Sequence, residues 1–185
     1  MSMAFTLERY LQAAPAPFDL LSHRHSATSL EAARLSHIPG AQLAKAVMLE
    51  DSAQHYLMAV LPATKKVELA PISAFAGCEM HLATEDELHK LFADCENGAV
   101  PPLGSAYGMQ TVWDETLLAE ADLYFEAGDH ETLVHMKTSD FIRLLGNADP
   151  LDFATPVNGA IESWRDLDFS DALAEDAWSD SDDWN

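Results

Sequence analysis

One lysine lies inside an otherwise apolar stretch of the sequence. Lys45 stands between two alanines in LAKAVML, residues 43–49, whose length and composition predict a strand covered on both faces. Lysine is seldom buried, so this ammonium either reaches solvent at a sheet edge or lies in a cleft. In a cleft it would bind an anion or a carbonyl oxygen, and burial would lower its pKa. The spacing alone favours the exposed position, although the small alanines would leave room for a ligand.

The segment GAVPPLG, residues 98–104, combines two glycines with two prolines. Pro101 and Pro102 fix φ and remove two N–H groups, whereas Gly98 and Gly104 allow positive φ and the close approach of a ligand. Such a loop holds its other backbone N–H and C=O groups in a fixed array. The array could polarise an ester carbonyl or bind a small amide or hydroxyl group. Taken alone, the loop would equally serve as a rigid connector.

His130 lies between two acidic residues, Asp129 and Glu131, at the tip of a predicted hairpin. A histidine with acidic neighbours could donate or accept a proton near neutral pH. The alternative is an exposed turn residue with no chemical role, and the local sequence by itself favours that alternative.

His23 and His25, with Glu31 beyond them, raise the possibility of a metal site. Their spacing is unspecific, so metal-dependent hydrolysis is the lowest-ranked hypothesis, and we expect neither a metal nor a cofactor. Cys78 and Cys95 are in no CxxC or similar spacing, which argues against a disulfide framework or a zinc site. The sequence also has no Gly-x-Ser-x-Gly, Walker loop or dinucleotide fingerprint.

Hydrophobic periodicity and capping signals predict the elements that position these residues. We expect helices over 6–13, 28–36, 85–93 and 140–145, and strands over 18–22, 43–49, 55–61, 79–83, 111–113, 123–127 and 132–136. Capping boxes begin the second and third helices, and Thr138 or Ser139 is expected to cap the last. The two long apolar strands should be central. The prediction is an α+β domain with a mixed, mostly antiparallel sheet, open or barrel-like, and several short helices packed around it.

The charge of the chain restricts its partners. With 31 acidic and ten basic residues among 185, the net charge is −21. Residues 166–185 hold eight of the acidic residues and no basic one, which leaves 23 acidic and ten basic residues, a charge of −13, before them. This field repels a long phosphate backbone, so we exclude duplex DNA and expect any nucleic acid to bind at a small local site.

Composition also predicts how the chain is organised. We expect one domain over residues 1–146, a loosely packed C-terminal extension over 147–165 and an acidic, disordered tail over 166–185. No apolar stretch approaches the roughly 18 residues that span a bilayer, so we expect no membrane partner. Glu8 and Arg9 interrupt the region where an export signal needs its apolar segment, so we expect a cytoplasmic protein.

Five segments, read in order, resemble the YbaK family of aminoacyl-tRNA deacylases, which is related to the editing insertion of bacterial prolyl-tRNA synthetases. The segments are HSATS at 25–29, QLAKAVML at 42–49, MAVLPATKKVEL at 58–69, LFADCENGAVPPLGSAYG at 91–108 and YFEAGDHETLVHM at 124–136. The likeness covers about residues 5–146 and leaves out the acidic tail.

The resemblance implies hydrolysis of the ester that joins a wrong amino acid to the terminal ribose of a tRNA. Lys45 occupies the place of a strand lysine that the family needs for activity. Gly98 and Pro102 fit a G-x-x-x-P loop that lies against the aminoacyl ester, and His130 falls near a position where some relatives carry a pocket histidine. The resemblance therefore implies catalytic roles for Lys45, Gly98 and His130.

Substrate-binding roles follow from the same matched segments. They fall on His25, Thr28, Ala99, Pro101, Pro102 and Gly104. The implied partners are the 3′ acceptor end of a mischarged tRNA and an aminoacyl-tRNA synthetase that could deliver it. The alternative, from another functional class, is a non-catalytic module of the same fold that binds an aminoacyl-tRNA end or a small amide-bearing ligand.

Overall fold

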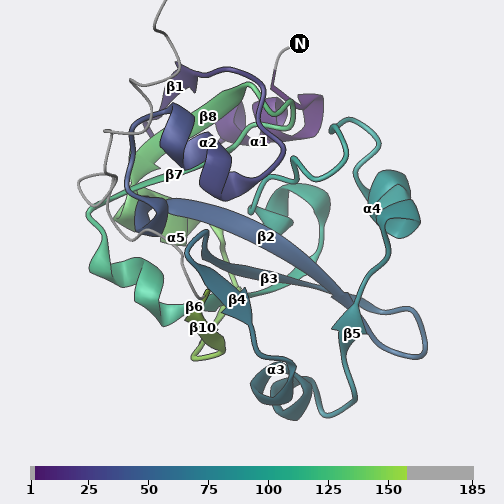
Figure 1. Cartoon of the computed structure of the whole chain (residues 1–185). Coiled ribbons are helices and arrows are strands. Elements are labelled where there is room, and N and C mark those ends of the chain that lie inside the picture. Colours follow the sequence, from purple (N-terminus) through teal and green to yellow (C-terminus); the bar gives the residue numbers. More distant parts are fainter. Residues whose placement is uncertain (1–2, 158–185) are drawn as a thin grey trace, which may run out of the picture.

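The computed structural model of the chain describes residues 3–157, which form a main sheet and a small two-stranded sheet with helices around them (Figure 1). The helices are α1 (Phe5–Ala13), α2 (Ser29–Leu35), α3 (Leu69–Ala76), α4 (Glu85–Leu91) and α5 (Thr138–Leu144). The strands are β1 (Asp19–Ser22), β2 (Leu43–Glu50), β3 (Tyr56–Pro62), β4 (Lys65–Val67), β5 (His81–Leu82), β6 (Gln110–Asp114), β7 (Asp122–Glu126), β8 (Thr132–Lys137), β9 (Asp149–Leu151) and β10 (Ala154–Pro156). Among the described residues, no helix has both the length and the apolarity that crossing a membrane requires.

The main sheet has eight strands and mixed pairing, as the sequence predicted. Its order is β1-β8-β7-β2-β3-β6-β9, with β5 added to β2, and β10 pairs separately with β4. The ladders β2–β3, β7–β8 and β1–β8 are antiparallel, with seven, five and four residue pairs, whereas β3–β6, β6–β9 and β2–β7 are parallel, with four, three and two. β1 and β9 form the two edges and do not pair with each other, so the sheet is open and not a barrel.

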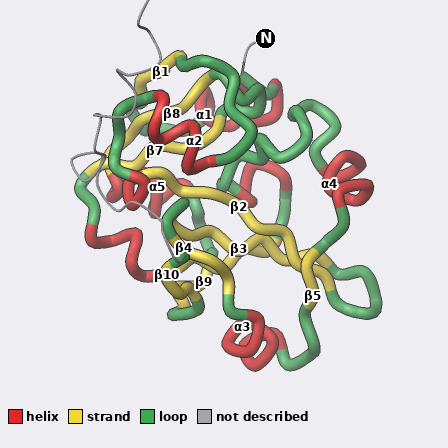
Figure 2. Tube along the Cα trace, viewed as in Figure 1, coloured by secondary structure: helices red, strands yellow, loops and turns green. Residues whose placement is uncertain are grey.

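The central position predicted for β2 and β3 is confirmed. The two strands pair in register from Ala44 opposite Pro62 to Glu50 opposite Tyr56. β3 is buried along almost its whole length, because its neighbours β2 and β6 cover both edges and helices and loops cover both faces. Figure 2 shows the helices distributed around these strands. A continuous apolar run is the expected pattern for a strand in such a position.

Alternation along the strands separates two apolar layers. On one face, Leu7 of α1 and Phe141 of α5 pack in the main core with Phe125 of β7. On the other face, Ala32 of α2 packs with Leu43 of β2 and with residues of β8, while Ile72 of α3 packs in a separate cluster. The centre of the sheet is therefore covered on both faces.

The predicted N-terminal caps are confirmed for α2 and α4 and are wrong for α5. Thr28 accepts a hydrogen bond from the Glu31 N–H at 3.2 Å and begins α2. Thr84 begins α4, and its N–H donates to the Glu87 carboxylate at 2.8 Å. The expected cap of the last helix is wrong, because Lys137 is the N-cap and Thr138 instead donates its hydroxyl proton to the Glu120 carbonyl.

Four of these α-helices and strands have no counterpart among the expected ones: β4, α3, β9 and β10. Each strand among them has only three residues, too few to show a period of two. The sequence of α3, LAPISAFA, is apolar nearly throughout and has a proline in its first turn. Without a polar face, it has no amphipathic pattern that would distinguish a helix from an irregular apolar segment.

The described part of the expected C-terminal extension, residues 147–157, is not loosely packed. β9 pairs with β6, β10 pairs with β4, and Phe153 between them is 2% exposed. The fully buried carboxylate of Asp114 holds this segment by accepting the N–H groups of Phe153 and Ala154 at 3.2 and 3.0 Å. Residues 158–165 and the acidic tail lie outside the described residues.

We predict that Asp114→Ala lowers the free energy of unfolding by about 3–5 kcal/mol, because it leaves buried N–H groups and the nearby Lys65 ammonium without their anion. Urea unfolding measures this change. Asp149→Ala, at an exposed position of β9, is the matched control and should stay within about 0.5 kcal/mol of the wild type. Equal stability of the two variants would contradict the anchoring role.

Candidate functional site

A break in strand pairing leaves one stretch of β2 open. On the edge opposite β3, β7 pairs only with Leu43 and Ala44, and β5 pairs only with Leu49 and Glu50. Within the described part of the chain, residues 45–47 have no strand partner on this edge. A hollow of about 220 Å³ lies here, lined by Ala46, Val47, Met48, Leu82, Ala83, Leu88, Gly98 and Val100.

The hollow follows the edge of β2 and does not lie on one face of the sheet. Ala46 and Val47 project to opposite faces, yet both line it. The carbonyl of Met48 accepts the Ala83 N–H at 3.0 Å on this same edge. Because backbone groups alternate along a strand, the N–H and C=O of Ala46 also point to this edge. The hollow therefore offers a bound molecule both a donor and an acceptor from the main chain.

Lys45 lies next to the hollow but does not line it. Its Nζ donates to the Ala63 carbonyl at 3.3 Å, which is long for a hydrogen bond. Ala63 in turn contacts Leu43, so the ammonium lies toward the start of β2. Burial lowers the pKa of Lys45, and no carboxylate of the described residues forms an ion pair with it. The ammonium is thus half-buried and held by one weak contact.

Gly98 and His130 are in direct contact. Gly98 has φ +90°, and a Cβ at this position would lie 3.6 Å from the His130 ring. His130 is 7% exposed, has φ +56°, and its Nε2 lies 2.7 Å from the Asn97 carbonyl. A carbonyl can only accept, so Nε2 carries the proton and the buried Nδ1 has no hydrogen-bond partner among the described residues. His130 therefore supports the turn at Gly98 and is not an exposed tip residue.

His25 covers this turn from the solvent side. Its ring centroid lies 5.3 Å from that of His130, and its Nε2 lies 3.5 Å from the Glu96 carboxylate. Ser26 is nearly fully buried and donates its N–H to the His130 carbonyl at 3.1 Å. The segment that carries His25 is thus fastened to the hairpin, and the structure brings together His25, Gly98 and His130.

Apart from Val100, which lines the hollow, the rest of the predicted loop is buried away from it. Ala99 is fully buried, and Pro101 and Pro102 are buried as well. Gly104 is in close contact with the core, since a Cβ there would lie 2.0 Å from the Thr111 hydroxyl. Of the six predicted substrate-binding residues, Ala99, Pro101, Pro102 and Gly104 therefore hold the loop in place, and none of the four lines the hollow.

Thr28 and the three candidate metal ligands make contacts with other groups of the protein; the three are His23, His25 and Glu31. The Thr28 hydroxyl caps α2, and the Glu31 carboxylate accepts the Ala27 N–H at 2.8 Å. His23 Nδ1 lies 2.7 Å from the Arg24 carbonyl. Within residues 3–157, no group of three or more His, Cys, Asp or Glu side chains has an arrangement that could hold a metal ion.

A buried carboxyl group lies at the end of β7, just before the turn that carries His130. Glu126 is 5% exposed, and its Oε2 has no hydrogen-bond partner among the described residues. Asp129 is fixed as a carboxylate acceptor of the Glu131 and Thr132 N–H groups at 3.1 and 2.8 Å. Burial, and to a smaller extent Asp129, raise the pKa of Glu126 to about 8. Glu126 is therefore protonated at neutral pH.

Most of the residues that line the hollow could not be singled out in the sequence. Ala46, Leu82, Leu88 and Val100 are ordinary apolar residues, and only the break between β7 and β5 brings them together around one hollow. One feature of the sequence did indicate this space. The alanines beside Lys45 indicated space, and the structure places that space on the side of Ala46.

Comparisons with known proteins identify a family and a shared fold. A family model described as an aminoacyl-tRNA editing domain matches residues 23–144. No curated protein matches the chain. Among solved structures, a protein described as hypothetical aligns with a TM-score of 0.73 and 23% identity over 81% of this chain and 99% of its own.

Two other solved structures have the same fold at lower identity. A candidate trans-editing enzyme for prolyl-tRNA synthetase aligns with a TM-score of 0.71 and 19% identity over 82% of this chain and 96% of its own. A candidate signal transduction protein from Marinobacter aquaeolei aligns with a TM-score of 0.64 and 20% identity over 83% of this chain and 31% of its own.

We predict that Glu126→Gln stabilises the protein relative to the wild type, and that this difference in the free energy of unfolding grows as pH rises. Between the ordinary glutamate pKa and about 8, the folded chain keeps a proton that the unfolded chain releases, so the wild type loses stability across this interval. Glutamine removes this loss, which is on the order of a few kcal/mol at pH 8. Urea unfolding at several pH values from 5 to 8 measures the difference, with the exposed Glu115→Gln as the control. A difference that does not change with pH would contradict the buried acid.

Proposed function

The chain belongs to the aminoacyl-tRNA editing domain family, and we propose that it is a trans-acting deacylase that hydrolyses the ester of mischarged tRNA. The observation that carries the proposal is the hollow in the edge of β2, where an apolar space meets free main-chain groups and the Gly98 turn. An aminoacyl ester needs these three things: room for a side chain, donors for its carbonyl and a fixed turn beside the bond.

The lining of the hollow favours a small apolar aminoacyl group. Its side chains are aliphatic or methionine, and its volume is about 220 Å³. Discrimination by one methylene in such a pocket amounts to only about 10–200-fold, so synthetases that charge small amino acids need a second selection step. The N–H and C=O of Ala46, which have no hydrogen-bond partner among the described residues, would bind the polar part of the same aminoacyl group.

Gly98 supplies the donor for the developing oxyanion in this mechanism. Its N–H has no hydrogen-bond partner among the described residues, and the His130–Asn97 contact fixes the turn. A donor that is held before the reaction stabilises negative charge on the carbonyl oxygen without the cost of reorganisation. His130 acts here by positioning Gly98, because its protonated Nε2 is already bound and its Nδ1 is buried.

Lys45 anchors the ribose or phosphate of the terminal adenosine in this proposal. Its flexible stem and its single long contact with the Ala63 carbonyl leave it free to turn toward a ligand at the neighbouring hollow. An ammonium with little competing charge around it would bind an anionic or hydroxyl oxygen strongly.

The reaction does not need a side-chain nucleophile. The ester is already activated by its neighbouring hydroxyl and ammonium groups, so water can attack its carbonyl carbon once the ester is held, and the ribose oxygen leaves as a hydroxyl group. Burial raises the pKa of the Cys95 thiol to about 11, which keeps it protonated and unreactive at neutral pH. Cys95 therefore does not act as a nucleophile in this mechanism.

The acidic surface limits how the substrate arrives. A charge of −21 repels the body of a tRNA, so recognition would be confined to the acceptor end. A synthetase that releases the mischarged tRNA would then deliver it. The structural relative described as a candidate trans-editing enzyme for prolyl-tRNA synthetase suggests that synthetase as the first to test.

Incubation with correctly and incorrectly charged tRNAs tests the proposed activity. We expect faster ester loss than the spontaneous rate for at least one mischarged tRNA, most readily one that carries a small amino acid. Lys45→Ala and Lys45→Met should both lower kcat/KM by about 100-fold or more, as expected for the loss of a key electrostatic group. Lys90→Ala, which removes an exposed lysine of α4, should leave the rate unchanged.

Ester loss no faster than the spontaneous rate for every pair would reject the enzyme. Retained binding of aminoacyl-tRNA in that case would establish the non-catalytic module. Hydrolysis that survives both Lys45 substitutions would reject the role of Lys45 and leave the activity in place.

A comparison of Gly98→Ala with Gly77→Ala distinguishes a role of Gly98 in the site from the effect of backbone strain alone. Gly77 also has positive φ, and a Cβ there would meet nothing within 4 Å. Both substitutions should therefore lose roughly 1–2 kcal/mol of stability from the left-handed backbone. Only Gly98→Ala should also lower kcat/KM, because its methyl group lies beside His130 at the ester. Equal activity of the two variants would remove Gly98 from the mechanism.

A further inference from the structure

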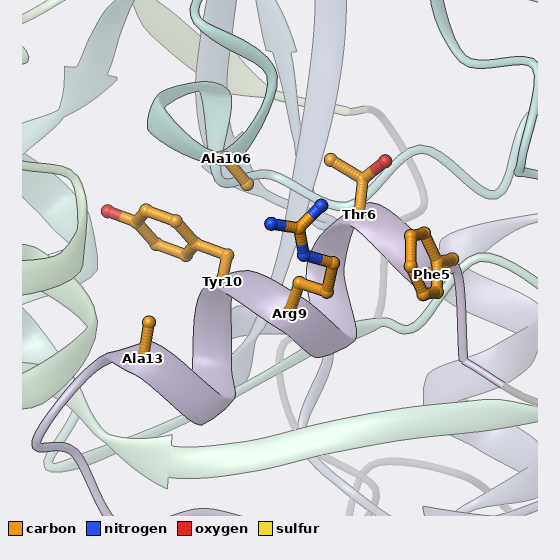
Figure 3. A pocket seen from close by; sticks show the side chains of 6 residues that line it. All are labelled: Phe5, Thr6, Arg9, Tyr10, Ala13 and Ala106. Atoms are coloured by element: carbon orange, nitrogen blue, oxygen red, sulfur yellow. The ribbon is translucent and has the colours of Figure 1, made fainter.

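A second hollow lies between α1 and the short 3-10 helix Gly104–Tyr107 (Figure 3). Its volume is about 370 Å³, and it is lined by Phe5, Thr6, Arg9, Tyr10, Ala13 and Ala106. This volume is within the range of roughly 300–1,000 Å³ that is typical of small-molecule sites. The mechanism proposed above uses none of these residues, and α1 precedes the segment that the family model matches.

Arg9 gives this hollow a positive charge in a strongly acidic chain. Its guanidinium extends from α1 toward Ala106, between Tyr10 and Thr6 (Figure 3). The guanidinium carbon lies 5.7 Å from the centre of the Phe5 ring, and no carboxylate of the described residues forms an ion pair with it. A guanidinium with five N–H donors is well suited to a phosphate group.

Aromatic rings stand on both sides of this guanidinium. Phe5 is 63% exposed, so its face is accessible. Tyr10 is held in place because its hydroxyl donates to the Leu144 carbonyl at 2.6 Å. Bases of single-stranded nucleic acids stack on such rings, while a nearby cation contacts the backbone.

Two hydrogen bonds place this hollow close to the candidate active site. The N–H of Thr6, which lines the hollow, donates to Asp94 Oδ2 at 2.8 Å. Gly98 follows Asp94 by four residues, a span of at most about 14 Å. The N–H of Ala4, just before α1, donates to the Ala127 carbonyl at 2.8 Å, beside the turn that carries His130. The nucleotides that precede a terminal adenosine can cover such a distance.

We propose that the hollow between α1 and the 3-10 helix binds the single-stranded acceptor end just before the terminal adenosine, with Arg9 on a phosphate and a base against Phe5 or Tyr10. This inference rests on the proposed function, because it assumes that the aminoacyl ester lies at Gly98. In this proposal α1 recognises the nucleic acid, whereas the net negative charge of the chain repels it. One local cation beside two rings would be sufficient for a weak, salt-dependent contact.

Two substrates test the proposal: mischarged tRNA and aminoacyl-adenosine, which lacks the preceding nucleotides. Arg9→Ala should raise KM for the tRNA about fivefold, the upper end for one exposed charge pair, and leave kcat unchanged. It should not change either constant for aminoacyl-adenosine. Arg34→Ala, at an exposed position of α2 with no ion pair among the described residues, is the matched control and should change neither substrate. An equal effect of Arg9→Ala on both substrates, or none on the tRNA, would overturn the proposal.

Binding of a single-stranded RNA that ends in CCA tests the hollow without catalysis. In fluorescence anisotropy, Arg9→Ala should weaken binding and reduce the slope of log K against log salt by about 0.7, the value for one phosphate of a single strand. This result in a protein without esterase activity would support the hollow and reject the proposed function. An unchanged slope with unchanged affinity would reject the hollow, whether or not the protein hydrolyses esters.

Discussion

The site depends on the incomplete pairing of one central strand. β2 is bonded to β3 along its whole length, but on its other edge it is paired only at its two ends. Unpaired backbone groups at a buried strand edge are costly unless a loop or a ligand satisfies them. The segment that contains Gly98 and Val100 covers this edge without pairing with it. In the space that remains, a ligand could reach main-chain donors and acceptors of the central strand pair.

The charged groups near the candidate site differ from the strongly acidic character of the whole chain. Glu126 is held protonated beside the turn that carries His130, so one acidic group near the site adds no charge at neutral pH. The Lys45 ammonium has no carboxylate partner among the described residues, and the same is true of Arg9. Local electrostatics therefore differ from the net charge, since interactions beyond about 10 Å are screened at ordinary ionic strength.

Much of this architecture could be predicted from the sequence. The apolar runs at 43–49 and 55–61 indicated the central strands, and the capping boxes indicated α2 and α4, because these patterns depend on neighbouring residues alone. The short strands β4, β9 and β10 could not be predicted, since their partners are distant in the chain. For the site, residue type indicated Lys45, Gly98 and His130. It could not show that His130 is a buried support or that Ala99, Pro101, Pro102 and Gly104 are packed away from the hollow.

A crystal structure with a non-hydrolysable aminoacyl-adenosine, in which an amide replaces the ester, tests the central claim most directly. The account predicts that the acyl side chain lies in the hollow against Ala46, that the amide carbonyl accepts the Gly98 N–H, and that the Lys45 ammonium has left the Ala63 carbonyl for the ribose or its phosphate. A ligand bound elsewhere, with the edge of β2 empty and Lys45 still on Ala63, would contradict it.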